Sequence, residues 1–206
     1  MTLLTSGWLS IWMTLGLAAD PINAVPSDDY ELLYNGKDFG GWLADPATLA
    51  HWKTSGGEIL ADGKGGNLVS EKLYRDFELR VDWKVEKGST GGVFLRGRPR
   101  VAIGDPDSSD PISGGLATNL EHPNKPTSKA DNPAGQWNTF RIELVGNVAT
   151  VFLNDQLVVE KVILENDYDR SRRIPVAGPI ELEAKGPITF RNIYIRPIAG
   201  ERPEAK

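Results

Sequence analysis

The alternation of apolar and polar side chains in the middle of the chain limits what it can fold into. From Gly135 to Glu160 the sequence reads GQWNTFRIELVGNVATVFLNDQLVVE, with apolar residues at roughly every second position. This period is typical of half-buried β-strands. Val145-Gly146-Asn147 and Leu153-Asn154-Asp155-Gln156 supply the turns, because Asn, Asp and Gly tolerate the positive φ of tight hairpins. The segment predicts a three-stranded antiparallel meander, with its third strand over Leu157 to Val162, that a second sheet must cover.

Other segments extend this pattern along the chain. Phe77 to Val85 alternates most clearly, with five apolar residues on one face and four charged residues on the other. Shorter strands are expected over 31–34, 58–61, 67–70, 93–96 and 97–103. Two pairs are expected to form hairpins, namely 58–61 with 67–70 and the closing strands 178–183 with 188–197. No segment predicts a convincing amphipathic helix, so we expect an all-β protein built as a sandwich of two antiparallel sheets.

The amino terminus has a different composition from the rest. Leu9 to Ala19 is apolar, ends in small residues and has the length of a signal-peptide core, too short to span a bilayer. Residues 1–24 therefore read as a signal peptide, although no Lys or Arg precedes Lys37. We expect residues 25–31 to be a linker, 32–198 one folded domain and 199–206 a flexible tail. The mature protein would be secreted or periplasmic, without a membrane anchor.

Charge and residue content exclude several classes of function. The net charge of −5 and the absence of a Lys/Arg-rich face argue against a nucleic-acid partner. The lack of Cys excludes disulfides and thiol nucleophiles, and two His residues make a zinc site improbable. The sequence contains no Gly-x-Ser-x-Gly motif, which argues against a serine hydrolase.

The segment from Gly104 to Ala134 has no regular pattern and contains five prolines. Loops of this length in compact domains usually carry function or are disordered, so this one is the first candidate for site-forming loops. This loop contains a cluster of oxygen ligands that could bind a calcium ion, namely Asp105, Asp107, Asp110, Ser108 and Ser109. Their spacing matches no EF-hand, and a solvated turn is the favoured interpretation. We otherwise expect no metal and no cofactor.

Five short motifs, in order, resemble one known family. They are Leu33-Tyr34-Asn35-Gly36-Lys37-Asp38-Phe39-Gly40-Gly41-Trp42, Asp76-Phe77-Glu78-Leu79-Arg80, Gly91-Gly92-Val93-Phe94-Leu95-Arg96, Gly135-Gln136-Trp137-Asn138-Thr139-Phe140-Arg141 and Phe190-Arg191-Asn192-Ile193-Tyr194-Ile195. Together they resemble the 3-keto-disaccharide hydrolase domain family, over about Leu32 to Pro197. The resemblance implies a concanavalin A-like jelly-roll sandwich and the cleavage of glycosides whose sugar is oxidised at carbon 3.

The implied chemistry requires a base and a cation or hydrogen-bond donor. A ketone at C3 acidifies the C2 proton, so a base can eliminate the aglycone from C1, after which water adds. Where relatives often carry an amide and an imidazole, this chain has Glu183 and Lys185, two positions apart. We expect Lys185 to stabilise the enolate while Glu183 or Asp105 takes the proton. Alternatively, Glu183 and Lys185 form a surface ion pair that does no chemistry.

Substrate-binding residues are expected around these catalytic candidates. They are Arg96, Arg98 and Arg100, which share strand parity if the register is continuous through Gly97, and the loop residues Asn119 and Glu121. The expected partner is a small-molecule carbohydrate, and the sequence leaves the oligomeric state open. A non-catalytic carbohydrate-binding module on the same sandwich is the alternative function. Convergence of Arg96, Arg100, Asp105, Glu183 and Lys185 in one pocket would favour the enzyme, whereas scattered placement would favour binding or a purely structural role.

Overall fold

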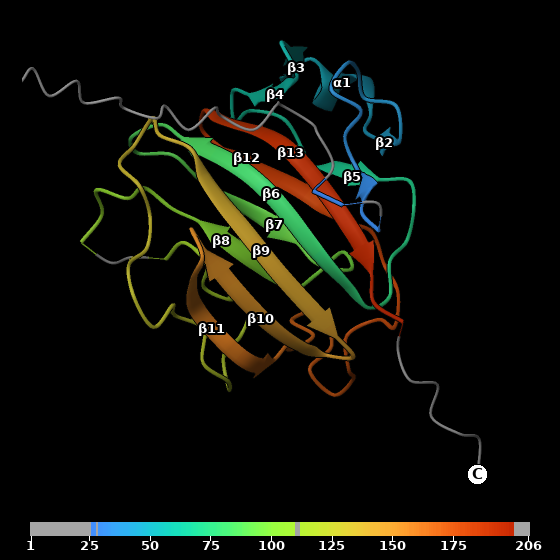
Figure 1. The fold of residues 1–206 in the computed structure, drawn as a ribbon, viewed down its shortest axis with the longest axis vertical. Helices are drawn as coiled ribbons and strands as arrows, with labels where there is room; N and C mark the ends of the chain where they lie inside the picture. The colour runs from blue at the N-terminus through green and yellow to red at the C-terminus, as the bar shows by residue number, and fades with distance from the viewer. Residues whose placement is uncertain (1–25, 28, 110–111, 200–206) are drawn as a thin grey trace, which may run out of the picture.

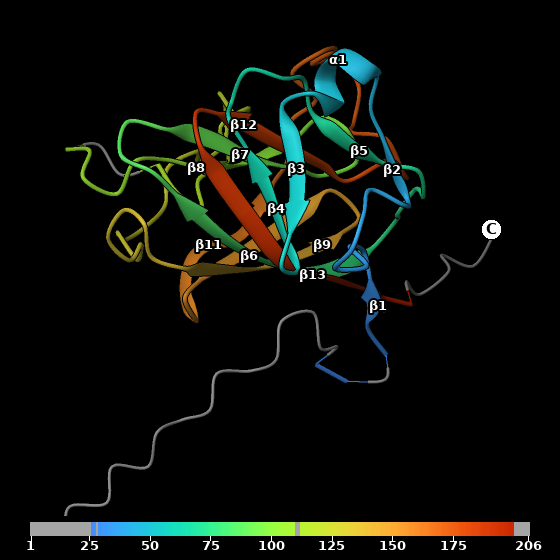
Figure 2. The ribbon, with the colours of Figure 1, turned by 90° about the horizontal axis from the view of Figure 1, so that it is seen from above.

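The protein is an all-β sandwich of two antiparallel sheets, as expected from the sequence. The computed structural model describes residues 26–27, 29–109 and 112–199. Figure 1 looks onto the larger sheet, and Figure 2 shows the two layers from the side, with β5, β7 and β12 in one and β6, β9 and β13 in the other. The predicted signal peptide lies outside the described residues.

The larger sheet has eight strands, in the order β11-β10-β9-β6-β13-β4-β3, with β1 paired to β13. Its strands are β1 (Glu31–Leu32), β3 (Trp52–Ser55), β4 (Glu58–Ala61), β6 (Phe77–Val85), β9 (Asn138–Val145), β10 (Val148–Leu153), β11 (Gln156–Ile163) and β13 (Ile188–Pro197). The predicted meander is present as β9, β10 and β11.

The smaller sheet has five strands, in the order β2-β5-β12-β7-β8. Its strands are β2 (Trp42–Leu43), β5 (Leu68–Ser70), β7 (Thr90–Phe94), β8 (Arg100–Ile103) and β12 (Glu181–Lys185). In the described part of the chain there is one short helix, α1 (Pro46–Leu49), and its N-cap is Asp45, whose side chain accepts a hydrogen bond from the Thr48 amide.

The core lies between the two sheets and follows the alternation in the sequence. On β6 the apolar set Phe77, Leu79, Val81, Trp83 and Val85 is buried against the smaller sheet. Trp42 and Trp52 are also buried, as core residues rather than sugar platforms. Trp137 differs from the inward residues of β9, because it is only partly buried and lies on the outer face of the larger sheet.

Both expected hairpins are wrong, because each predicted pair is divided between the sheets. β4 and β13 belong to the larger sheet, whereas their expected partners β5 and β12 belong to the smaller one. The chain crosses from one layer to the other at residues 62–67 and again at 186–187. Gly63 and Gly186 meet at these crossings, both with positive φ. Alternation defines the buried face of a strand but not the sheet to which it belongs.

The long loop closes the edge of the sandwich beside β8. Its segment 114–117 runs along this edge strand, where Ala102 donates to the Gly115 carbonyl at 2.8 Å and Ala117 donates to the Arg100 carbonyl at 3.0 Å. Farther along, the Thr127 amide donates to the Val158 carbonyl of β11 at 2.8 Å. The loop therefore connects the edges of both sheets.

Candidate functional site

Strand β12 presents three charged residues, Glu181, Glu183 and Lys185, at alternate positions. Side chains two residues apart on a strand point to the same face, and their neighbours Leu182 and Ala184 are buried in the core. The three charges thus lie on the outer face of the smaller sheet. β12 is flanked there by β5 and β7, so its backbone is held on both sides.

Arg100 reaches this row of charges from the edge strand β8. Its guanidinium forms an ion pair with the Glu183 carboxylate, across the intervening strand β7. Gly92 of β7 stands between the two residues, opposite both Glu183 and Ala102. A Cβ at Gly92 would come within 2.8 Å of Arg100 Cγ and 2.9 Å of Cδ. The absence of a side chain at Gly92 is therefore what lets Arg100 cross the strand.

Glu183 is the most enclosed charge on this face, with 8% of its surface exposed. Its Oε2 pairs with Arg100, and its Oε1 lies 3.7 Å from Nζ of Lys185, an ammonium that is largely exposed. Glu181 is held separately, since its carboxylate accepts a hydrogen bond of 2.9 Å from Asn67. The arrangement places one shielded carboxylate between two cations on a face open to ligands.

A cavity of about 270 Å³ adjoins this group of charges. It lies where segment 112–125 of the long loop meets β8, and it is lined by Arg100, Ala102, Ile112, Gly115, Ala117, Asn124 and Lys125. Arg100 belongs both to the cavity wall and to the ion pair with Glu183. Charged groups and cavity are thus parts of one continuous surface.

Asp105, expected as an alternative base, lies at the end of β8. Its Oδ2 accepts the Gly88 amide at 2.8 Å, and its Oδ1 accepts the Asp107 amide at 2.9 Å. The amides of Asp107 and Gly88 hold the pKa of the Asp105 carboxyl below its usual value. This geometry ties two turns together and makes Asp105 a weaker base.

The arginines expected to bind substrate do not lie together. β7 ends at Phe94 and β8 begins at Arg100, with Arg96 and Gly97 between them at positive φ. This kink breaks the parity that continuous register would give. Arg96 is buried and donates to the Gly146 carbonyl at 2.6 Å and to Asp76 at 2.7 Å, while Arg98 is exposed and its guanidinium lies 4.7 Å from the ring centre of Tyr168.

The loop candidates Asn119 and Glu121 lie beside Glu165 rather than beside Glu183. Asn119 is fully buried, and its amide donates to the Ile163 carbonyl at 2.9 Å. Glu121 is exposed, and its backbone amide donates to Glu165 at 2.8 Å.

Glu165 is the centre of this second group, a role that the sequence does not indicate. It accepts the amides of Leu120, Glu121 and His122, the His122 ring at 3.0 Å and the Arg170 guanidinium. Its partners are mostly more than forty positions away, so no local pattern indicates this role.

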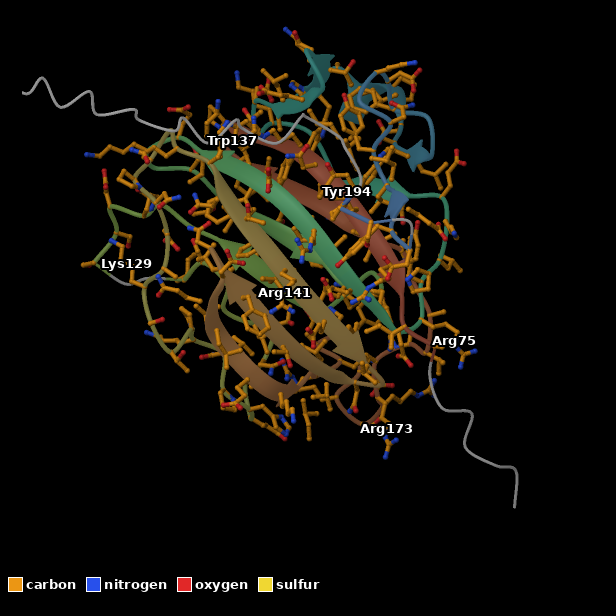
Figure 3. The ribbon with its side chains drawn as sticks, viewed as in Figure 1. Arg75, Lys129, Trp137, Arg141, Arg173 and Tyr194 are labelled. Atoms are coloured by element: carbon orange, nitrogen blue, oxygen red, sulfur yellow. The ribbon has the colours of Figure 1, made fainter. Side chains whose placement is uncertain are left out.

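The outer face of the larger sheet also carries charges and aromatic rings. Figure 3 looks onto this face, with Trp137 and Arg141 labelled. Guanidinium groups cover the rings there: Arg191 lies 3.9 Å from the ring centre of Trp137, and Arg141 lies 3.6 Å from that of Phe152. Because cations already occupy these rings, the face is a poorer stacking platform for a sugar than the face around Glu183.

Two further expectations concern metals and membranes. Among the described residues no three or more His, Asp or Glu side chains gather as a metal site would require. Asp110, a member of the calcium alternative, lies outside the described residues. No helix in the described part of the chain has the length and apolar character needed to cross a membrane.

Comparison with known proteins places these features in context. A family model described as a 3-keto-alpha-glucoside-1,2-lyase-like domain matches residues 29–196. The chain is 26% identical over 173 residues to the 3-keto-disaccharide hydrolase of Bacteroides thetaiotaomicron, a match that covers 66% of this chain and 59% of that protein. The match therefore spans about three fifths of this curated relative.

Solved structures share the fold. A Parabacteroides distasonis protein provisionally assigned as a glycosyl hydrolase superposes with a TM-score of 0.69 at 19% identity, covering 87% of this chain and 100% of that one. The β-glucanase of Bacillus licheniformis superposes with a TM-score of 0.54 at 13% identity, covering 82% and 97%. At these identities the likeness shows a common jelly-roll sandwich and no more.

Proposed function

Since the chain belongs to the 3-keto-alpha-glucoside-1,2-lyase-like domain family, we propose that it cleaves glycosides whose sugar carries a ketone at C3. The observation that carries the proposal is the shielded Glu183 carboxylate between Arg100 and Lys185 on the outer face of the smaller sheet. An elimination next to a ketone requires a base for the C2 proton and a cation or hydrogen-bond donor for the enolate, and this group of charges offers both.

The proposed reaction begins at the C2–H bond. Glu183 takes the C2 proton, and the electron pair moves onto the C3 oxygen as an enolate, which the Lys185 ammonium and the Arg100 guanidinium stabilise. The enolate then collapses toward C1 and expels the aglycone oxygen, which takes up the proton held by Glu183 as the alcohol leaves. Water adds across the C1–C2 double bond, so glycoside and water yield a 3-keto sugar and a free alcohol.

The ion pair with Arg100 gives Glu183 a defined orientation before substrate arrives. A carboxylate that is fixed by hydrogen bonds loses little freedom when the sugar binds. When the C3 oxygen becomes negative, Arg100 can share its donors between Glu183 and the enolate, because a guanidinium has five N–H groups. The scheme uses these two cations where other enzymes use a metal, so we expect EDTA to leave activity unchanged.

The test is release of alcohol from a chromogenic 3-keto-glucoside by the full chain. Glu183→Gln keeps the shape of the side chain but removes the base, so kcat/KM should fall by about 10² to 10⁴. Lys185→Ala removes one enolate donor and should lower kcat/KM by about 10².

A matched control exists on the opposite sheet. Glu143 is a strand carboxylate that pairs with Arg141, two residues away, at 2.5 Å. Glu143→Gln removes a similar ion pair far from the proposed site and should leave kcat/KM unchanged. If Glu143→Gln and Glu183→Gln reduce release equally, or if the wild type releases no alcohol, the proposed function is wrong.

A carbohydrate-binding module remains the alternative. Sugar binding by the wild type with no release of alcohol would favour it. Export is likewise a proposal, which rests on the apolar segment Leu9 to Ala19. Finding the processed chain outside the cytoplasm, without residues 1–24, would support export, whereas an uncleaved cytoplasmic chain would contradict it.

A further inference from the structure

The floor beside Glu183 consists of very small residues. Across the smaller sheet, Glu183 stands opposite Gly92, and Gly92 stands opposite Ala102. Beyond β8, the backbone of Gly115 bonds to Ala102. Neighbouring strands are about 4.8 Å apart, so these residues form a strip of small residues that leads from the carboxylate, beneath the Arg100 side chain at Gly92, to the cavity at Ala102 and Gly115. The small residues at the cavity end of this strip leave room for a planar group.

The walls and floor of the cavity at the end of this strip are mainly apolar. Ile112 forms one wall, directly above Gly104, where an added Cβ would overlap its side chain. Ala102 and Ala117 contribute methyl groups, and the polar residues are Arg100, Asn124 and Lys125. An apolar cavity with few polar groups binds apolar ring systems better than sugars, because a sugar hydroxyl without a partner keeps its desolvation cost.

The cations of the cavity also fit a planar ring. The Arg100 guanidinium lies 6.0 Å from the ring centre of Phe94, and both Arg100 and Lys125 line the cavity. Cations near an aromatic face are attracted by its quadrupole. They also favour a phenolate, which is the leaving group that elimination from an aryl glycoside produces.

We infer that this cavity is the aglycone subsite and that it takes an aromatic aglycone in preference to a second sugar. The inference rests on the proposed function, because it treats Glu183 as the point where the sugar reacts. It names Ala102, Gly115, Ala117 and Ile112 as the residues that determine which aglycone is accepted.

Binding tests the cavity without any turnover. Phenyl and methyl α-D-glucoside, neither of them oxidised, are titrated by NMR against the full chain. The phenyl compound should bind about tenfold more tightly, since an apolar pocket discriminates by this order. Ala102→Gln fills the cavity floor and should abolish the preference, and so should Ala117→Leu, a change at an exposed position that spares the core.

The control and a second readout separate the possible failures. Thr150→Gln adds similar bulk on the outer face of the larger sheet and should leave the preference intact. Equal affinities, no binding of either glucoside, or a preference that survives both cavity variants would overturn the inference. The 3-keto forms of the same glucosides report turnover. If neither of them is cleaved, the proposed function is wrong, but the binding titration still tests the cavity.

Discussion

Arg96 was expected to bind substrate because of its charge, but its position in the fold makes it a structural residue. Only 3% of the surface of Arg96 is exposed. Its guanidinium donates to the backbone carbonyls of Arg75, Gly146 and Pro175 and to the Asp76 carboxylate. These acceptors come from the ends of β6 and β9 and from the loop before β12. One side chain therefore connects three separate parts of the chain.

Replacing Arg96 with Lys should destabilise the fold without changing the chemistry. An ammonium cannot serve four acceptors in one plane, so buried carbonyls and Asp76 would lose partners. We expect the free energy of unfolding, measured in urea, to fall by about 3 kcal/mol, while kcat/KM per folded molecule stays the same. Arg98→Lys, at an exposed position, should change stability by less than about 0.5 kcal/mol. If the folded Arg96→Lys variant lost turnover, Arg96 would have a role in the site after all.

At the scale of elements, the crossings between the sheets depend on glycine. Gly63 and Gly186 are so close that a Cβ on Gly63 would overlap the backbone of Gly186. These two glycines join the crossing from β4 to β5 with the crossing from β12 to β13. Since Lys185 directly precedes Gly186, the same contact fixes the end of the strand that carries Glu183.

Gly63→Ala should therefore cost much more than an ordinary positive-φ substitution. Gly41 is the matched control, because its φ of 86° is close to the 80° of Gly63 but an added Cβ would contact nothing within 4 Å. We expect Gly41→Ala to cost about 1 kcal/mol from backbone strain alone. Gly63→Ala adds a backbone overlap and should cost at least about 3 kcal/mol in a urea titration. Equal costs would mean that the two crossings are not packed as described.

The contact between the loops around residues 120 and 165 should depend on pH. Burial raises the pKa of Glu165, but the amides of Leu120, His122 and Glu121 and the His122 ring outweigh it and lower the pKa from 4.5 to about 2. A carboxylate whose pKa is lowered in the folded state adds its full stability at pH values above its pKa in the unfolded chain. This stability is lost as pH falls from about 4.5 toward 2. Melting temperatures of the wild type should fall through this interval.

Glu165→Gln provides the comparison for this pH dependence. The variant cannot ionise at this position, so it should be less stable than the wild type at pH 7 and should lose less stability between pH 5 and pH 2.5. Parallel pH profiles for the two proteins would show that Glu165 does not stabilise this contact.

At the scale of the whole molecule, local patterns predict the long strands well, but they miss the short strands β2 and β3 and predict strand partners poorly. Phe77 to Val85 was predicted with the bounds that β6 has, because its alternation spans nine residues. The expected hairpins failed because turn-like glycines can also lead from one sheet to the other. The fold class still followed, because it depends on the number and period of strands and not on their pairing.

The candidate site divides in the same way. That Glu183 and Lys185 share a face follows from their spacing alone. The ion pair between Arg100 and Glu183 joins residues 83 positions apart, across a strand whose glycine admits the arginine. The cavity requires yet another segment, the long loop. No local period contains these relations, because they arise only when both sheets and the loop edge have formed.

This dependence on the whole fold leads to a prediction about unfolding. Glu183 lies on β12, Arg100 on β8 and the apolar wall on segment 112–125, and all three are joined through β7 and the edge of β8. If the sandwich unfolds as one cooperative unit, the site cannot be lost before the core. Turnover of the 3-keto-glucoside and near-ultraviolet circular dichroism, which reports buried residues such as Trp83, should therefore fall at the same urea concentration. Activity lost at clearly lower urea would show that the loop edge opens independently, and the site would then depend on the loop more than on the two sheets.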